Sequence, residues 1–305
     1  MSDALVPVLE VGGTHVSAAL VDSHTWAVVT QSRVDVDGSG DAATILDTWA
    51  AAAAALRAVP GASWGVAMPD PFDYARGIAR FRDVGKFDAL DGLDVGAELA
   101  QRLGGEPSFV FLNDADAFVL GEWTQGAAEG CARCVAITLG TGLGSGWLVD
   151  GRVTTEEPGV PTLGRARTLS IDGVGLEEVV STRGIRAAYV GRDGDPSNDV
   201  REIAALARSG DATARAALDA VFDALGRGIG PALREFRADV VVIGGSIARS
   251  WDLLEPSFRR GLDWADAPPI VLATHPDDAA LRGAARAAGQ PRSDADENAR
   301  MRGRL

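Results

Sequence analysis

The segment that decides the fold reads VPVLEVGGTHVSAALV over residues 6–21: an apolar run, a glycine turn and a second apolar run. Short apolar runs bounded by glycine are typical of β-strands, so the sequence predicts strand, tight turn, strand. A related segment, CVAITLGTGLGSGWLV, occupies residues 134–149. The two align without a gap, with Gly12 corresponding to Gly140. This shared register favours an internal duplication and therefore two related domains.

Apolar spacing elsewhere predicts strands that alternate with helices, which is the pattern of the α/β class. We expect helices over 41–59, 95–103, 176–190, 200–209, 212–236 and 279–288, buried strands over 62–68, 109–112 and 240–243, and a loop over 154–172. The expected division is a small N-terminal α/β domain over 1–117, completed by the final helix at about 277–289, and a larger C-terminal domain over 118–276. The polar stretch 290–305 is expected to be a disordered tail.

Composition narrows the classes of function. The 305 residues suffice for two domains, 46% of them are apolar, and the formal net charge is −14. A chain this acidic repels nucleic acid and also free nucleotide phosphates, so a nucleotide site needs backbone N–H groups, a metal ion or local arginines. Neither a leader segment nor an uninterrupted apolar span is recognisable, so we expect a cytoplasmic protein that does not enter a membrane.

The two glycine turns are the first candidates for binding phosphate. Gly12-Gly13-Thr14 and Gly140-Thr141-Gly142 each follow an apolar strand directly, and glycine lets backbone N–H groups come close to a phosphate. A dinucleotide fingerprint needs a third glycine opening a helix, but Ser145 and Trp147 stand there, which disfavours a nucleotide-dependent oxidoreductase. The alternative for each turn is an ordinary hairpin.

Three further motifs have both a structural and a functional interpretation. Asn113-Asp114-Ala115 lies between a strand and a helix; it could cap the helix, or present a carboxylate where ligands of α/β sheets gather, and the two roles are compatible. Gly244-Gly245-Ser246 could seat a ligand ring against the backbone or be a plain turn. Cys131 and Cys134 flank a buried strand and lack partners for a zinc site, so we interpret them as ordinary cysteines.

Taken together, four motifs resemble the successive signatures of the ROK family of sugar kinases: LEVGGT at 9–14, LNDA at 112–115, LGTGLG at 139–144 and IGG at 243–245. The resemblance runs from about Val6 to Ala288. It implies the actin-like ATPase fold, with two ribonuclease H-like α/β domains facing a cleft that takes ATP, Mg²⁺ and a sugar, in a homodimer. Family members that act as repressors carry an N-terminal helix-turn-helix, which we do not expect before Gly12.

The resemblance also assigns roles to residues. Asn113 and Asp114 would hold the sugar, with Asp114 as the base that activates its hydroxyl. The remaining motif residues would bind ATP: Gly12, Gly13 and Thr14 as the first phosphate loop, Gly140, Thr141 and Gly142 as the second, and Gly244 and Gly245 near the adenosine.

The sequence departs from the family pattern in three places. Glu10 stands where the family has an aspartate, and it is a possible Mg²⁺ ligand. Asp70 replaces the glycine of a Pro-Gly pair. The zinc motif is missing: Thr168, Ser170 and Gly175 stand at its three cysteine positions, and Arg165 lies near its Gly-Glu-x-Gly-His stretch. Only Glu177, and Ser181 four residues on, keep the pattern. We therefore expect no zinc site, and substrate contacts from Asp70, Arg165 and Glu177.

The sequence thus predicts ATP-dependent phosphorylation of a hydroxyl on a sugar, an amino sugar or a sugar-like cyclitol. Because the glycine of the Pro-Gly pair and the Gly-Glu-x-Gly-His stretch are changed, we expect glucose to be a poor substrate. The alternative, favoured by Glu10 and by the lost zinc motif, is a non-catalytic sugar- or nucleotide-binding protein that keeps the kinase fold.

Overall fold

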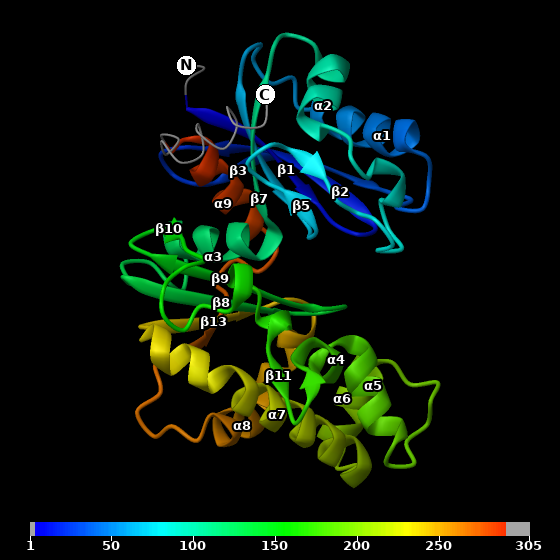
Figure 1. The fold of residues 1–305 in the computed structure, drawn as a ribbon, viewed down its shortest axis with the longest axis vertical. Coiled ribbons are helices and arrows are strands. Elements are labelled where there is room, and N and C mark those ends of the chain that lie inside the picture. Colours follow the sequence, from blue (N-terminus) through cyan, green and yellow to red (C-terminus); the bar gives the residue numbers. More distant parts are fainter. Residues whose placement is uncertain (1–3, 291–305) are drawn as a thin grey trace. The chain divides into compact units, whose positions relative to one another are not determined.

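The computed structural model describes residues 4–290, which divide into two compact units (Figure 1). One unit holds the described residues up to Gln125 together with those from Asp277 onward, and the other runs from Gly126 to Pro276. The boundary expected at residue 117 falls inside helix α3 (Asp114–Thr124), so the division comes after that helix. The expected disordered tail lies outside the described residues, apart from Gln290.

The first unit is built on a five-stranded sheet in the order β3-β2-β1-β4-β7. Strands β1 and β2 form an antiparallel hairpin around the first glycine turn, while β4 and β7 run parallel to β1. The bounds are β1 Leu5–Val11, β2 His15–Asp22, β3 Val28–Asp35, α1 Ala42–Ala54, β4 Ser63–Met68, β5 Phe72–Asp73, β6 Ile78–Ala79, η1 Asp88–Leu90, α2 Val95–Leu103, β7 Ser108–Asn113 and α9 Ala279–Ala288.

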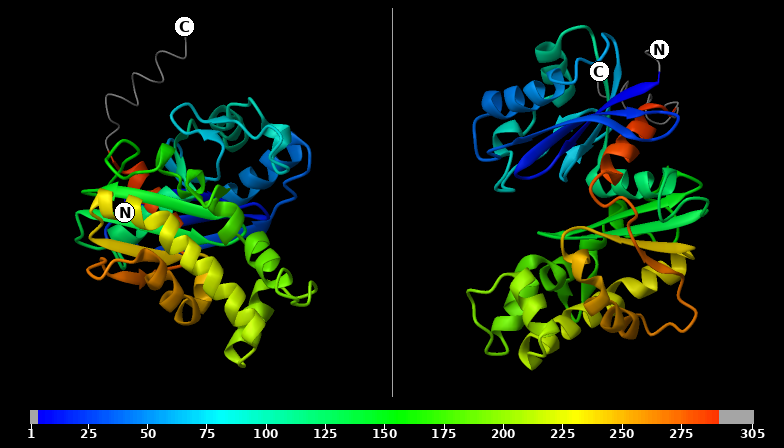
Figure 2. Two further views of the ribbon diagram at one scale, coloured as in Figure 1. Left: turned by 60° about the horizontal axis from the view of Figure 1, so that its bottom comes forward. Right: turned by 180° about the vertical axis from the view of Figure 1, so that it is seen from behind.

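Strand β1 is apolar apart from Glu10, because both faces of this sheet are covered. Leu9 belongs to a core shared with Trp49 of α1, whereas its neighbour Val8 packs in a second cluster with Leu281 of α9. Helix α9, drawn in red in Figures 1 and 2, lies against the sheet beside α3. A segment from the end of the chain therefore completes the core of its first unit.

The second unit repeats the plan of the first, with a sheet in the order β10-β9-β8-β13-β14. Its hairpin strands β8 (Arg133–Leu139) and β9 (Leu143–Val149) begin 128 residues after β1 and β2. Strands β13 (Val240–Gly244) and β14 (Ile270–Leu272) run parallel to β8, as β4 and β7 do to β1. The structure thus confirms the repeat that the gapless register predicted.

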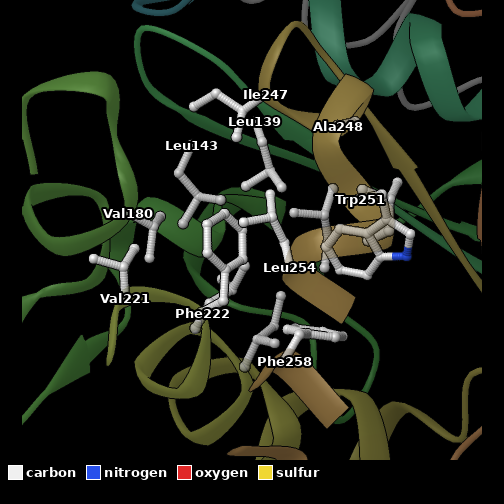
Figure 3. Packing of buried hydrophobic residues seen from close by; sticks show 14 of the residues in the cluster. Leu139, Leu143, Val180, Val221, Phe222, Ile247, Ala248, Trp251, Leu254 and Phe258 are labelled. Carbon is white, nitrogen blue, oxygen red and sulfur yellow. The ribbon is translucent and has the colours of Figure 1, made fainter. Parts of the chain in front are cut away.

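Five α-helices and a short two-stranded hairpin fill out this unit. Leu139 and Leu143, which flank the second glycine turn, pack in one core with Phe222 of α7 and with Trp251 and Phe258 of α8 (Figure 3). The turn is therefore held at both ends by buried side chains. The remaining bounds are β10 Arg152–Val153, η2 Thr162–Gly164, η3 Ala166–Thr168, β11 Ser170–Ile171, β12 Val174–Gly175, α4 Leu176–Val180, α5 Thr182–Val190, α6 Val200–Arg208, α7 Ala212–Phe236, η4 Ile247–Ser250 and α8 Trp251–Leu262.

The structure corrects two details of the secondary structure expected from the sequence. The helix expected over 176–190 is interrupted at Ser181, whose side chain accepts a hydrogen bond from the Gly184 N–H (3.3 Å) and so caps α5. The sequence also failed to predict β3, α8 and β14. Within the described residues, no helix combines the length and apolarity that a membrane crossing requires.

Candidate active site

Acidic and amide side chains gather where the three parallel strands of the first unit end. Glu10 of β1 lies level with Ala67 of β4, and Met68 of β4 pairs with Asn113 of β7. The chain leaves β4 through Asp70 and leaves β7 directly into α3. Because parallel strands present their carboxyl ends at one edge, the fold brings together Glu10, Asp70, Asn113 and Asp114, four positions that the sequence singled out.

Asn113 is a fixed amide at this edge. It is 3% exposed, and its Oδ1 accepts hydrogen bonds from the Ala115 N–H (3.0 Å) and, more weakly, from the Asp116 N–H (3.4 Å). It is therefore the N-cap of α3, and capping sets which way the amide points. Its Nδ2 donates to the hydroxyl of Tyr74 (3.1 Å).

Tyr74, which the sequence did not single out, links Asn113 to Asp70. Its hydroxyl donates to Asp70 Oδ1 (2.8 Å), with the Met68 carbonyl oxygen also in reach at 3.2 Å. Burial and the negative charge of Asp70 raise the pKa of Tyr74, so the phenol stays neutral and remains a donor. The ring is held against Phe72 of β5, with centroids 5.4 Å apart.

Asp114 is the first residue of α3, and its side chain is exposed. One of its oxygens accepts a hydrogen bond from the Ala115 N–H (2.8 Å). Because Asn113 is the N-cap, the capping interpretation of this motif applies to Asn113. The first turn of the helix stabilises a carboxylate at position 114, and this carboxylate is exposed at the edge of the sheet.

Glu10 lies among other negative charges at this edge. Its pKa is raised to about 7, first by burial and then by the charge of Asp114, with Asp277 and Asp278 adding to the rise while Arg33 opposes it. Among residues 4–290, no cluster of three or more histidine, cysteine or acidic side chains is arranged to hold a metal. Mg²⁺ does not require such a cage, because it commonly takes one or two carboxylates together with water and substrate phosphates. The oxygen donors and excess negative charge here fit that mode.

The first glycine turn is compact. The Gly12 N–H donates to the carbonyl oxygen of His15 (2.8 Å), and a Cβ on Gly12 would lie 3.0 Å from Cε1 of His15. Thr14 is exposed, and its carbonyl oxygen accepts from the Val36 N–H (2.9 Å). Gly12, Gly13 and Thr14 thus form an ordered turn at the same edge as Glu10.

In the second unit, the turn of residues 140–142 is clamped from helices α4 and α5. Glu177 Oε1 accepts a hydrogen bond from the Leu143 N–H (3.0 Å), and Thr182 donates through both N and Oγ1 to the Gly140 carbonyl oxygen (3.1 and 2.9 Å). A Cβ on Gly142 would lie 2.5 Å from Glu177 Oε1. These contacts make Glu177 a support of the turn, while its expected contact with substrate stays a prediction.

The Gly244-Gly245 turn lies beside this second glycine turn. Gly244 ends β13 opposite Thr138 of β8, and Gly245 has φ +85° with its Cα against the carbonyl oxygen of Leu139, where any side chain would overlap it. A Cβ on Gly140 would lie 3.7 Å from the Ser246 hydroxyl oxygen. The residues expected to bind ATP in this unit are therefore gathered at one edge of its sheet.

The segment that replaces the zinc motif is attached to the sheet by hydrogen bonds. The buried Ser145 hydroxyl donates to the Gly164 carbonyl oxygen (2.7 Å) and accepts from the Ala166 N–H (2.7 Å). Arg165, between these contacts, is only 7% exposed, whereas Arg167 is exposed. A hydroxyl in the duplicated hairpin thus anchors the segment.

We expect the purified protein to contain less than about 0.1 zinc per chain, because tetrahedral zinc needs four close ligands. Cys134 is buried at the start of β8, with its Sγ 3.5 Å from the Cys131 carbonyl oxygen, and burial raises the pKa of its thiol to about 12, which disfavours the thiolate that binds metal. Elemental analysis after dialysis against chelator provides the measurement. About one zinc per chain that leaves only on unfolding would contradict the expectation.

Comparison of the sequence with known proteins assigns the chain to a family. The family model described as "ROK family" matches residues 7–290. A glucokinase from Thermotoga maritima is 31% identical over 250 residues, 72% of this chain and 77% of that protein, and an N-acetyl-D-glucosamine kinase from Salmonella newport is 28% identical over 219 residues, 65% and 71% of the two chains.

The solved structures agree with this match. The ROK hexokinase from Thermus thermophilus superposes with a TM-score of 0.76 at 27% identity, covering 93% of this chain and 97% of that one. The α/β class and the actin-like ATPase fold expected from the sequence are thereby confirmed.

Proposed function

We propose that this chain, which belongs to the ROK family, transfers the terminal phosphoryl group of ATP to a hydroxyl of a sugar, an amino sugar or a sugar-like cyclitol. The observation that carries the proposal is the exposed Asp114 carboxylate beside the fixed amide of Asn113, at the strand edge that also holds Glu10. That the chain is an ATP-dependent sugar kinase is supported by its glucokinase and hexokinase relatives.

Asp114 is the base in this proposal. A sugar hydroxyl is a weak nucleophile at neutral pH, and a carboxylate within about 2.6–3.2 Å of it can accept its proton. As the hydroxyl oxygen bonds to the γ-phosphorus, the bond from that phosphorus to the β–γ bridging oxygen breaks and ADP leaves. The proton passes to an Asp114 oxygen. Position 114 suits this step because its carboxylate is not needed as the helix cap.

Asn113, Tyr74 and Asp70 position the acceptor. The Asn113 amide and the Asp70 carboxylate are joined through the Tyr74 hydroxyl, so each holds the other in one orientation. Such a network can orient neighbouring hydroxyls without moving when the substrate binds, which lowers the entropy lost on binding.

The two glycine turns and Gly244-Gly245 hold the nucleotide in this proposal, through backbone N–H groups that an acidic protein can offer to phosphate. Glu10 is the residue of this edge that would hold Mg²⁺, which when bound neutralises charge on the β- and γ-phosphates. Phosphoryl transfer depends mainly on such positioning and charge neutralisation.

A non-catalytic binding protein is the second candidate function, and the observation that favours it is Glu10, a longer side chain at a position where the family has an aspartate. The two candidates differ in turnover: a kinase releases ADP only when an acceptor is present, whereas a binding protein takes up ATP and sugar without reaction. Dimerisation and a cytoplasmic location remain predictions, the first testable by light scattering.

Asp70 sets the preference for the acceptor in this proposal, since its carboxylate is fixed by Tyr74 and is the right charge to pair with a protonated amine. We expect wild-type protein to favour an amino sugar over glucose. Asp70→Asn should reduce the ratio of kcat/KM for glucosamine to kcat/KM for glucose by about tenfold or more, as expected for a lost charge-assisted hydrogen bond.

Glu106→Gln, which removes an exposed carboxylate of the same unit, is the matched control and should leave the ratio unchanged. Efficient phosphorylation of glucose by the wild type, with amino sugars and cyclitols far weaker, would refute this assignment of Asp70.

A further inference from the structure

Lys86 is the only lysine of the chain, and it lies against the first glycine turn. A Cβ built on Gly13 would be 3.5 Å from both Cδ and Nζ of Lys86. The ammonium nitrogen therefore lies within van der Waals distance of the position that a side chain on Gly13 would occupy. The proposed function assigns this turn to phosphate binding. Both residues belong to the first unit, so their juxtaposition depends only on the fold of that unit.

The backbone that carries Lys86 is anchored on both sides. Phe87 is fully buried, packs edge-on against Trp49 with centroids 5.3 Å apart, and donates its N–H to the Gly38 carbonyl oxygen (2.6 Å). On the other side, Asp88 Oδ1 accepts hydrogen bonds from the N–H groups of Val84 (3.1 Å) and Gly85 (3.0 Å). The lysine stem therefore starts from a fixed position.

The charge of Lys86 has no protein counterpart in the part of the chain that the structure describes. Its ammonium forms no ion pair with a carboxylate there, although the chain carries 43 acidic residues. The nearest acidic residue in sequence, Asp88, is already engaged by the two backbone N–H groups. A cation that has no carboxylate partner and lies beside a glycine turn is suited to bind an anionic ligand.

We propose that Lys86 binds the phosphate chain of the donor nucleotide at the Gly12–Thr14 turn. The proposal rests on the proposed function, because it takes the nucleotide as the source of that phosphate. An ammonium supplies three donors and a compact positive charge, and lysine is a common phosphate ligand of this kind. In a protein of net charge −14, this local cation offsets the repulsion that the surface exerts on ATP.

Lys86→Met tests the proposal, with Arg82→Met as the matched control. Arg82 lies four residues away, its side chain is 79% exposed, and its ion pair with Asp91 is on the surface, so its loss changes net charge equally while little else changes. Both variants and the wild type are titrated calorimetrically with the non-hydrolysable ATP analogue AMP-PNP plus Mg²⁺, and with adenosine. Lys86→Arg is a third variant that keeps the charge.

The Lys86→Met variant is expected to bind Mg·AMP-PNP about 10- to 100-fold more weakly than the wild type, with adenosine affinity unchanged within about twofold. Arg82→Met should stay within about threefold of the wild type for both ligands. Lys86→Arg should recover at least half of the lost binding free energy, and equal melting temperatures would show that all variants are folded.

Three results would overturn the proposal. If Lys86→Met binds Mg·AMP-PNP as Arg82→Met does while the wild type phosphorylates a sugar, the lysine assignment fails and the kinase assignment stands. If Lys86→Met weakens adenosine and Mg·AMP-PNP equally, Lys86 supports the fold and not the phosphate. A wild type that binds no nucleotide would remove the proposed function and this inference together.

Discussion

Asp114→Asn is expected to lower kcat by about 10²- to 10⁴-fold while sugar and ATP affinities change by less than about threefold. Asparagine keeps the size and most of the hydrogen bonding of aspartate, but it cannot accept the proton of the sugar hydroxyl. The fold should survive, because Asn113 is the residue that caps α3. Steady-state kinetics with a turned-over acceptor, and calorimetric titrations with the same acceptor and nucleotide, measure the two quantities separately.

Asp41→Asn is the matched control for this change. Asp41 caps α1 in the same unit, where its Oδ1 accepts a hydrogen bond from the Thr44 N–H (2.9 Å), and asparagine caps about as well as aspartate. Its kcat should equal that of the wild type. If the Asp114→Asn variant retained more than about a tenth of wild-type kcat, Asp114 would not be the base.

Gly283→Ala is expected to unfold the first unit or to lower its melting temperature by about 10 °C or more. Gly283 lies on α9 where a Cβ would overlap the Ala117 carbonyl oxygen of α3, and Gly121 of α3 stands in the same relation to Ala279 of α9. Because these two glycines have no side chains, the backbones of α3 and α9 pack in direct contact. Overpacking typically costs about 1–3 kcal/mol, and more where the added atom meets rigid backbone, as it does here. In a unit of about 150 residues, about 4 kcal/mol corresponds to roughly 10 °C.

Gly289→Ala provides the comparison at the end of the same helix. Its φ is −87°, and a Cβ there meets nothing closer than 3.8 Å, so the change should shift the melting temperature by less than about 2 °C. Scanning calorimetry of both variants is the measurement. Similar melting temperatures for Gly283→Ala and the wild type would mean that α3 and α9 do not pack as closely as described.

The parts of the fold and site that the sequence predicted are those with strong local signals. Glycine turns after apolar runs located both hairpins, and the strand-to-helix change at Asn113-Asp114 located the candidate base. Helix α7 was predicted with its bounds because its caps and apolar spacing are regular. By contrast, β3 lies at a sheet edge with mostly polar, exposed residues, so it lacks the apolar alternation that marks a strand.

The features that the sequence could not predict depend on contacts between distant segments. Tyr74 meets Asn113 across 39 residues, and Lys86 meets Gly13 across an even longer separation, so no local pattern marks either residue. Glu177 was predicted to contact substrate because it keeps a family position, yet its hydrogen bond to the Leu143 N–H is formed only once α4 packs beside the second turn. In each case tertiary packing, and not local secondary-structure propensity, determines which partner the side chain contacts.

Acceptor-dependent ADP release by the wild-type protein tests the central claim most directly. Purified protein with Mg·ATP would be offered glucose, mannose, glucosamine, N-acetylated amino sugars and cyclitols one at a time, with the product identified by mass spectrometry. We predict ADP release that requires at least one of these acceptors and yields its monophosphate in equal amount. Binding of ATP and of a sugar with no acceptor-dependent ADP and no sugar phosphate would contradict the claim and identify a binding protein.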